Sequence, residues 1–316
     1  MKNRFGIGGV LEMALLAAVF LAKLDRLALV ARHARAGQTA GERRSTKRGT
    51  SVEFADYRDY ARGDDLRRVD WNVYARLERP YVKLFEEEED LAVRILLDGS
   101  GSMEWGSEDA EVGGRESKER NKWLYARRLA AALGYVALTS GDRLAAANLK
   151  SQISNFKFGP VRGRGHVLRF FDWLEEVRAE GTTDLNAALR SYAVSGGRAG
   201  LVVLISDLFS PAGYAEGLTA LAARGHEVAI LHVLSPDEVE PPLGGDLRLL
   251  DVETGESQEV TIDGGMRTLY RRRLEEWQDE IRAICRARDV HYVPIVTDTP
   301  FERVVLYDLR RVGLVR

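Results

Sequence analysis

From about residue 92 onward, the sequence alternates between apolar runs rich in β-forming residues and amphipathic helical patterns. Five of the runs resemble strands: LAVRILLD, DRLAAANL, AGLVVLISD, HEVAILHVL and VHYVPIVT. Continuous apolar strands are buried on both faces, and parallel strands need crossovers that are usually helical. The alternation therefore predicts an α/β fold with a doubly wound, mostly parallel sheet that is covered by helices on both faces.

The segment at residues 247–263, LRLLDVETGESQEVTID, interrupts this alternation before the last long helical pattern. It reads as two short strands around a turn at Thr254 and Gly255, which predicts an inserted β-hairpin. The helical pattern that follows contains the one cysteine, Cys285, at helical spacing from apolar neighbours. We expect a buried structural thiol there, and a chain with one cysteine forms no internal disulfide.

An apolar segment near the N-terminus, VLEMALLAAVFLAKLDRLALVAR, is interrupted by Glu12, Lys23 and Asp25. Its uncharged stretch covers residues 13–22, about half of the roughly 20 residues that a membrane-spanning helix needs. We expect a helix that packs on the body of the protein or on a partner, with peripheral membrane contact as the alternative. The basic stretch that follows reads either as a solvated linker or as a polyanion-binding segment.

The composition limits the possible classes of protein. A content of 45% hydrophobic and 30% charged residues is ordinary for a globular chain and excludes disordered and fibrous classes. The formal net charge of −2 gives no overall attraction to nucleic acid, and the single cysteine fits a cytoplasmic location. Contact of the N-terminal helix with a bilayer would place the protein at the membrane periphery. We expect three parts: an N-terminal helix and basic linker at residues 1–40, a polar and aromatic segment at 41–90, and the α/β domain at 91–316.

Two of the predicted strands end on a carboxylate. Asp98 closes the strand in ILLDGSGSME and is followed by Ser100 and Ser102, and Asp207 closes GLVVLISD. Thr183 lies in GTTDLNAAL, just before a helical pattern. Doubly wound sheets bind ligands at the carboxyl ends of their strands, so we expect these side chains to meet at one edge. Oxygen donors without nitrogen or sulfur favour Mg²⁺ or Mn²⁺.

Two alternatives stay open at these positions. Thr182 and Thr183 are adjacent, and the choice of Thr183 rests on its place just before Asp184. Asp and Ser at strand ends also cap helices and close turns, and this is the purely structural interpretation of the same residues.

The pattern Asp98-x-Ser100-x-Ser102, with Thr183 and Asp207 downstream, resembles the metal-ion-dependent adhesion site of von Willebrand factor type A domains. The resemblance covers residues 90–300 and implies a von Willebrand A-like, Rossmann-like fold. It implies that the two serines bind a metal through their hydroxyls, that the threonine binds directly or through water, and that both aspartates act mainly through bound water. A partner's carboxylate would complete the coordination. Leu208 stands where many of these domains have glycine, which we expect to narrow the space above the metal.

The segment before the α/β domain, GTSVEFADYRDYARGDDLRRVDWNVYARLERPYVKLFEEEED, resembles the signature of the bacterial family called domain of unknown function 58. The match runs from about residue 41 to the end of the chain. It implies a partner or adaptor of a MoxR-type AAA+ ATPase, because members are commonly encoded beside such ATPases. Many members also have an N-terminal pair of membrane helices, for which this chain offers no convincing counterpart.

The same segment is dense in aromatic, arginine and carboxylate side chains. This composition is typical of interface anchors and equally of an internal lattice of ion pairs, and both interpretations stay open. The candidate interface residues are Tyr57, Arg58, Tyr60, Asp64, Asp65, Arg67, Asp70 and Trp71.

Together these features predict a non-enzymatic, metal-dependent module for protein–protein interaction. A Mg²⁺-dependent hydrolase or phosphatase, in which the metal activates water, is the first alternative, and a metal-free scaffold is the second. The sequence contains no phosphate-binding loop, since GPVRGRGH lacks the Lys-Ser/Thr pair, and no G-x-S-x-G nucleophile elbow.

Overall fold

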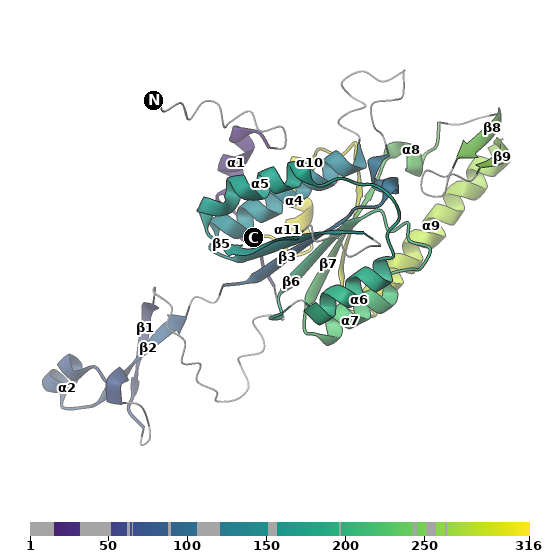
Figure 1. The fold of residues 1–316 in the computed structure, drawn as a ribbon. Coiled ribbons are helices and arrows are strands. Elements are labelled where there is room, and N and C mark those ends of the chain that lie inside the picture. The colour runs from purple at the N-terminus through teal and green to yellow at the C-terminus, as the bar shows by residue number, and fades with distance from the viewer. Residues whose placement is uncertain are drawn as a thin grey trace, which may run out of the picture. The chain divides into compact units, whose positions relative to one another are not determined.

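The computed structural model shows a chain that divides into two compact units, residues 38–90 and the remainder (Figure 1). The larger unit combines residues 1–37 with residues 91–316. The structure describes residues 16–31, 52–61, 64, 66–87, 90–105, 121–150, 157–195, 197–242, 245–250, 257–262 and 264–316.

A six-stranded sheet in the order β10-β7-β6-β3-β4-β5 forms the centre of the larger unit. Five strands run parallel and β5 pairs antiparallel with β4, so the predicted mostly parallel α/β sheet is confirmed. The strands are β3 (Ala92–Asp98), β4 (Arg143–Leu149), β5 (Lys157–Arg162), β6 (Leu201–Ser206), β7 (Glu227–Leu234) and β10 (His291–Val296).

The sequence patterns did not predict β5. Its residues KFGPVR contain no apolar run, and Phe158 is the one buried side chain of the strand. A strand at the edge of a sheet is covered on fewer sides and tolerates proline, so it lacks the apolar signal of the central strands.

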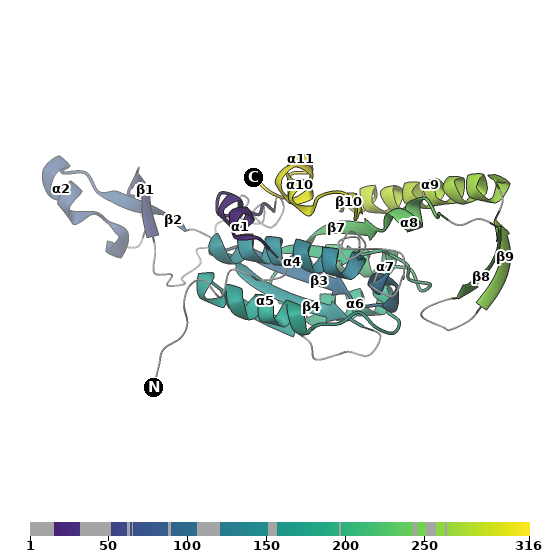
Figure 2. The ribbon, with the colours of Figure 1, turned by 90° about the horizontal axis from the view of Figure 1, so that it is seen from above.

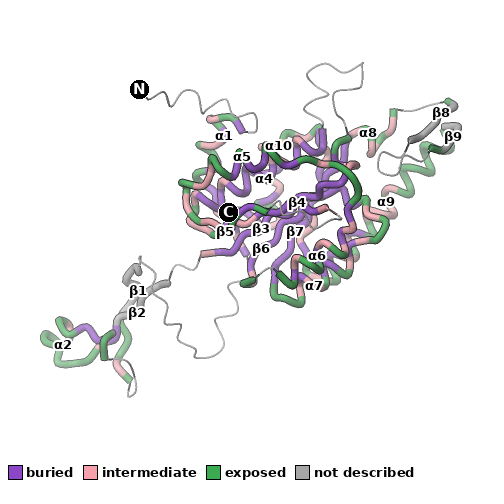
Figure 3. Tube along the Cα trace, in the orientation of Figure 1, coloured by how far each residue is buried: buried purple, intermediate pink, exposed green. Residues whose placement is uncertain are grey.

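Helices cover both faces of the sheet, with α4 and α5 on one face and α6 and α7 on the other (Figure 1). Successive side chains of a strand point to opposite faces: Val93 and Ile95 join one buried cluster with α4 and α5, whereas Leu96 joins a second cluster with α6, α7 and α9. The burial pattern makes the sheet the inner layer (Figure 3). The helices are α4 (Lys122–Thr139), α5 (Val167–Glu176), α6 (Leu185–Ser195), α7 (Ala215–Ala223) and α9 (Gly264–Arg286), with the single turns η3 (Gly101–Glu104) and η4 (Arg164–His166).

The N-terminal helix α1 (Ala18–Leu24) packs on the body of the larger unit, as predicted for the described part of this segment. Phe20 contacts Phe301 edge-on at a centroid distance of 5.1 Å, and Leu29 forms a β-bridge with Val315. None of the helices in the described part of the chain combines the length and apolar character needed to cross a bilayer. The C-terminal segment contributes α10 (Phe301–Arg303), the π-turn η5 (Val304–Asp308) and α11 (Leu309–Arg311).

The predicted insertion is present as the hairpin of β8 (Gly245–Leu250) and β9 (Ser257–Ile262), which pair antiparallel. The expected turn at Thr254 and Gly255 lies outside the described residues. A short helix, α8 (Pro236–Val239), precedes the hairpin, and α9 follows it and runs back along the sheet (Figure 2). Cys285 on α9 is buried, which confirms the predicted structural thiol, and burial raises its pKa to about 11.

The smaller unit contains an antiparallel pair, β1 (Val52–Asp59) and β2 (Tyr81–Glu87). Between them lie the turn η2 (Leu66–Arg68) and the helix α2 (Trp71–Leu77). Asp70 starts α2, because its carboxylate accepts hydrogen bonds from the backbone N–H groups of Asn72 and Val73. The side chains of α2 are largely exposed (Figure 3).

Candidate metal centre

The ends of β3 and β6 bring two of the predicted site residues to one edge of the sheet. The two strands are parallel neighbours with Leu97 opposite Ile205, so Asp98 follows this pair by one residue and Asp207 follows it by two. The Ser206 hydroxyl links the two strand ends, because it donates to Asp98 Oδ2 at 2.6 Å and accepts from the Leu208 N–H at 2.8 Å. Asp98 and Asp207 are 2% and 0% exposed.

The two serines of the first loop lie directly beside Asp98. The Ser100 N–H donates to Asp98 Oδ1 at 3.1 Å, and the Ser100 and Ser102 hydroxyl oxygens are 3.0 Å apart. A Cβ on Gly99 would lie 2.3 Å from Asn148 Oδ1, so a side chain at this position would displace Asn148 of β4.

The loop that contains Thr183 is fastened to the serine loop. The Gly101 N–H donates to the Gly181 carbonyl at 2.7 Å, and the Glu180 N–H donates to the Gly99 carbonyl at 2.8 Å. Thr183 is buried, and its hydroxyl donates to the Leu149 carbonyl at 3.3 Å, whereas Thr182 is exposed. Asp184 has a different task, because its carboxylate accepts from the Ala187 N–H at the start of α6.

A fully buried lysine contacts the second carboxylate. Lys122 Nζ is 2.6 Å from Asp207 Oδ2 and 2.5 Å from Glu238 Oε1, and the lysine is 0% exposed. The sequence reasoning missed this residue. Its signal was available, since Lys122 stands on the same helical stripe as the buried Ala126 and Leu129 of α4. A lysine on an apolar stripe indicates a buried charge that needs a partner.

The charges at this edge of the sheet do not balance among themselves. The ammonium of Lys122 contacts the carboxylates of Asp207 and Glu238, and the buried carboxylate of Asp98 lies beside them, so the four groups have a net charge of −2 when all are ionised. Burial raises the pKa of Asp98 to about 6, and the negative charge of Asp207 adds to the rise. Burial also raises the pKa of Glu238, against the opposing effect of Lys122.

His232 supports the backbone of Asp207 rather than offering a metal ligand. One ring nitrogen, Nε2, lies 3.0 Å from the Asp207 carbonyl, and Nδ1 lies 2.7 Å from the Tyr292 hydroxyl. A carbonyl only accepts, so Nε2 carries the proton and Nδ1 accepts from Tyr292. Burial lowers the pKa of His232 to about 4, which keeps the ring neutral.

Leu208 does not stand above the site, contrary to the expectation from the sequence. It has a positive φ of 59°, and its side chain is 2% exposed within the second buried cluster. Phe209 is the residue that reaches the surface instead, with 40% exposure. The left-handed backbone of Leu208 turns its own side chain into the core and leaves that of Phe209 at the surface. The residue types alone do not reveal this arrangement.

Among the described residues, no group of three or more His, Cys, Asp or Glu side chains lies close enough together to hold a metal. The predicted set consists of two carboxylates and three hydroxyls, so it is a different kind of site. We call Asp98, Ser100, Ser102, Thr183 and Asp207 the candidate metal centre.

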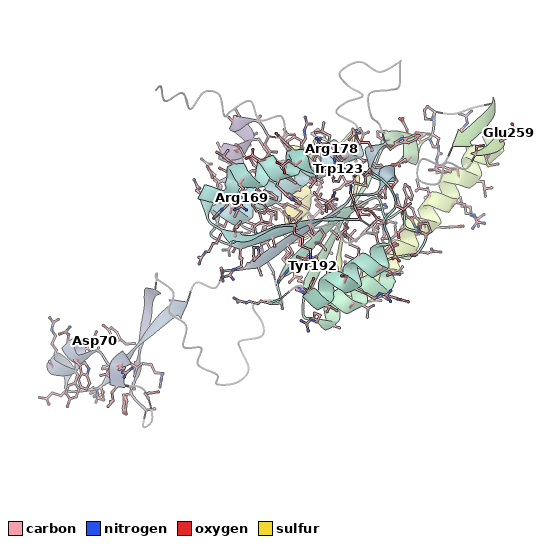
Figure 4. The ribbon with its side chains drawn as sticks, in the orientation of Figure 1. Asp70, Trp123, Arg169, Arg178, Tyr192 and Glu259 are labelled. Carbon is pink, nitrogen blue, oxygen red and sulfur yellow. The ribbon has the colours of Figure 1, made fainter. Side chains whose placement is uncertain are left out.

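The candidate interface residues of the smaller unit largely bond to one another. The Tyr57 hydroxyl donates to Asp70 Oδ2 at 2.8 Å, and Arg58 Nη2 lies 2.9 Å from Asp64 Oδ1. Trp71 is 57% exposed, beside Asp70, which Figure 4 labels. Tyr60 is half-buried and Arg67 is exposed. Asp65 lies outside the described residues.

Curated relatives match most of the chain, among them two mycobacterial proteins. The uncharacterized protein Rv1480 of Mycobacterium tuberculosis and the uncharacterized protein Mb1516 of Mycobacterium bovis are each 31% identical over 254 residues. These residues are 79% of this chain and 76% of each relative.

Two solved structures are similar at low sequence identity. The conserved hypothetical protein BatB from Bacteroides thetaiotaomicron is 16% identical with a TM-score of 0.42, over 71% of this chain and 98% of that chain. An aerotolerance-related membrane protein from Bacteroides fragilis is 17% identical with a TM-score of 0.40, over 70% of this chain and 99% of that chain.

The profile of a family described as protein of unknown function DUF58 matches residues 56–280. The matched region begins in β1 of the smaller unit, includes every residue of the candidate metal centre, and ends within α9. The chain therefore belongs to the DUF58 family.

Proposed function

We propose that this protein is a metal-dependent interaction module. Mg²⁺ or Mn²⁺ would bind at the candidate metal centre, and an acidic side chain of a partner protein would complete the coordination. One observation carries the proposal: two buried carboxylates from adjacent strand ends, with serine hydroxyls alongside, form with Lys122 and the half-buried Glu238 a group whose charges sum to −2 when all are ionised. A divalent cation would neutralise that charge.

The donor set suits a hard cation that keeps part of its water. The Ser100 and Ser102 hydroxyls would bind it directly, with Thr183 binding directly or through water. Each oxygen of Asp98 already accepts one hydrogen bond from the protein, which suits a role through bound water. Neutral hydroxyls leave the cation attractive to a further acid, and this is the basis for recognition of a carboxylate.

The proposed partner is a MoxR-type AAA+ ATPase, and the proposed location is the cytoplasm or the membrane periphery. The proposed partner rests on the family resemblance of the segment at residues 41–90 and on the exposed aromatic surface of the smaller unit, where Trp71 and Tyr74 are 57% and 44% exposed. The proposed location rests on the single cysteine and on the apolar N-terminal segment. Exposed aromatic residues are frequent anchors of protein interfaces.

A metal-free scaffold is the second candidate, and Lys122 favours it. Its ammonium already neutralises Asp207, so the edge of the sheet holds an internal cation without any metal. The interaction module and the scaffold differ in whether a divalent cation from solution neutralises the remaining negative charge.

The melting temperature tests this difference in the full chain. Excess Mg²⁺ or Mn²⁺ should raise it relative to EDTA, because a ligand that binds the folded state stabilises it by about 2.7 kcal/mol at 100 times its Kd. Asp98→Asn should lose the rise.

Asp184→Asn is the matched control, since Asp184 is a carboxylate on the same edge that caps α6. It should keep the full response to metal. An unchanged melting temperature of the wild type in metal and in EDTA would favour the scaffold instead.

A further inference from the structure

An exposed aromatic side chain lies next to the candidate metal centre. Phe209 is two residues beyond Asp207, and its backbone N–H donates to Asp207 Oδ1 at 3.1 Å. The side chain is 40% exposed, although the two residues before it are fully or almost fully buried. A large apolar side chain in this position presents contact surface to whatever approaches the metal.

Phe209 is held in place from two sides. It stacks on Trp277 of α9 with a centroid distance of 5.2 Å and an interplanar angle of 11°, and Lys122 Nζ lies 5.2 Å from the centre of its ring. Trp277 in turn packs edge-on against His232 at 5.1 Å. The ring is therefore already ordered before any partner arrives, and this lowers the entropy lost on binding.

The apolar surface continues along α9. Tyr270 and Met266 precede Trp277 by seven and eleven residues, which places all three on one face of the helix. Tyr270 and Met266 are 38% and 39% exposed. The Tyr270 hydroxyl donates to the Glu238 carbonyl, which fixes this part of α9 to α8. Figure 2 shows α9 leading from the sheet toward the hairpin. We call Phe209, Trp277, Tyr270 and Met266 the aromatic shelf.

We propose that the aromatic shelf receives apolar side chains that flank the metal-binding acid of the partner. The partner segment would thus be a peptide in which an aspartate or glutamate stands between apolar residues. The inference deepens the proposed function and rests on it. Charge complementarity selects the acid, because the centre would contain a divalent cation, and the shelf that adjoins Asp207 selects its neighbours.

Two synthetic peptides test the inference on the full chain. One is acetyl-Gly-Leu-Asp-Phe-Gly-amide, and the other is acetyl-Gly-Gly-Asp-Gly-Gly-amide, which has the same acid without apolar flanks. Calorimetric titration in Mg²⁺ should show the apolar peptide binding about tenfold more tightly, since one well-packed aromatic anchor contributes that much. In EDTA neither should bind.

Phe209→Ala should reduce the affinity for the apolar peptide to that of the glycine peptide and leave the glycine peptide unchanged. Leu168→Ala is the matched control. Leu168 is also exposed, at 50%, and it lies on α5, which follows the antiparallel edge strand and so begins at the opposite edge of the sheet. This variant should retain the tenfold preference. The comparison of the two peptides in wild type stands even where Phe209→Ala folds poorly.

The outcomes of these experiments distinguish a failure of the aromatic shelf from a failure of the metal centre. Equal Mg²⁺-dependent binding of both peptides to wild type would overturn the aromatic shelf and leave the metal centre standing. Absence of any Mg²⁺-dependent binding or thermal shift would overturn the proposed function itself. A wild-type dimer in sedimentation experiments that Phe209→Ala makes monomeric would assign the shelf to a second copy of this chain and so reject the peptide.

Discussion

The carboxylates of the smaller unit and those of the candidate metal centre are satisfied in different ways. In the smaller unit, Asp70 accepts from neutral backbone and tyrosine donors, and Asp64 pairs with its own arginine. At the edge of the large sheet, Asp207 and Glu238 share the ammonium of Lys122, and the buried Asp98 accepts from the Ser100 N–H and the Ser206 hydroxyl. Among the described residues, Asp64 and Asp70 thus find hydrogen-bond partners within the smaller unit, whereas the group around Asp98 and Asp207 has more carboxylates than ammonium groups.

Replacing Lys122 should have the largest effect. Lys122→Met would leave the fully buried Asp207 without its cation, and breaking a buried ion pair in this way costs about 3 to 5 kcal/mol of unfolding free energy. Urea unfolding in EDTA measures the loss. Mg²⁺ should restore part of it, because the added cation replaces the missing charge.

The matched control for this variant is Lys150→Met, since Lys150 pairs with Glu180 at the surface. That pair is solvated and should contribute far less. Equal losses in the two variants would show that burial does not distinguish the pair at the metal centre.

Gly99→Ala should have the next largest effect. The new Cβ would lie 2.3 Å from Asn148 Oδ1, so Asn148 must shift and give up its hydrogen bond to the Arg178 carbonyl. Overpacking of this kind costs about 1 to 3 kcal/mol. The displaced serine loop should also weaken the thermal response to Mg²⁺. Gly165→Ala is the control, since no heavy atom lies within 4 Å of its added Cβ.

Asp70→Ala should affect the smaller unit alone. The change removes the N-cap of α2 and the partner of the Tyr57 hydroxyl, with an expected loss of about 1 kcal/mol in that unit. Hydrogen exchange should quicken at the amides of α2. Asp70→Asn, which keeps a capping oxygen, should exchange more slowly than Asp70→Ala, and neither should alter the response to Mg²⁺. A lost metal response would mean that the two units share one function.

The smallest predicted effect is a pH dependence that owes nothing to metal. His226 lies just before β7, at the edge of the sheet opposite the candidate metal centre, and burial, aided by Arg94, lowers its pKa below 6.5. The unfolded chain binds the proton more readily, so this stability is fully present above pH 6.5 and is lost as the pH falls below it. His226→Asn should flatten that part of the profile in EDTA and in Mg²⁺ alike. A change that depends on metal would contradict this assignment.

Much of the larger unit follows from local sequence patterns. The five parallel strands were predictable because each contains an apolar run, which is longest where the strand is buried on both faces. The parallel pairing of β3 and β6 brings Asp98 and Asp207 to the same edge. The inserted hairpin was evident from its alternation and its turn residues. In each case the signal and the structure lie in the same short stretch of chain.

The features that escaped prediction depend on residues distant in sequence. Lys122 finds its carboxylates 85 and 116 positions away, and no local pattern specifies such partners. The outward turn of Phe209 depends on the positive φ of Leu208 and on a stack with Trp277. The edge strand β5 buries only Phe158 and so leaves little mark on the sequence.

The bridge between Leu29 and Val315 has a consequence for how the chain folds. The bridge joins segments from near both ends of the sequence. The smaller unit, residues 38–90, is an insertion within the stretch of chain that the bridge closes. Closing so long a stretch of chain has a large entropic cost, and the bridge can be stabilised only once the intervening sheet has formed. We therefore expect the bridge to form late in folding. Because its sequence lies between two parts of the larger unit, the smaller unit is connected to it at both ends. A protease that cuts one connection would leave the smaller unit attached by the other.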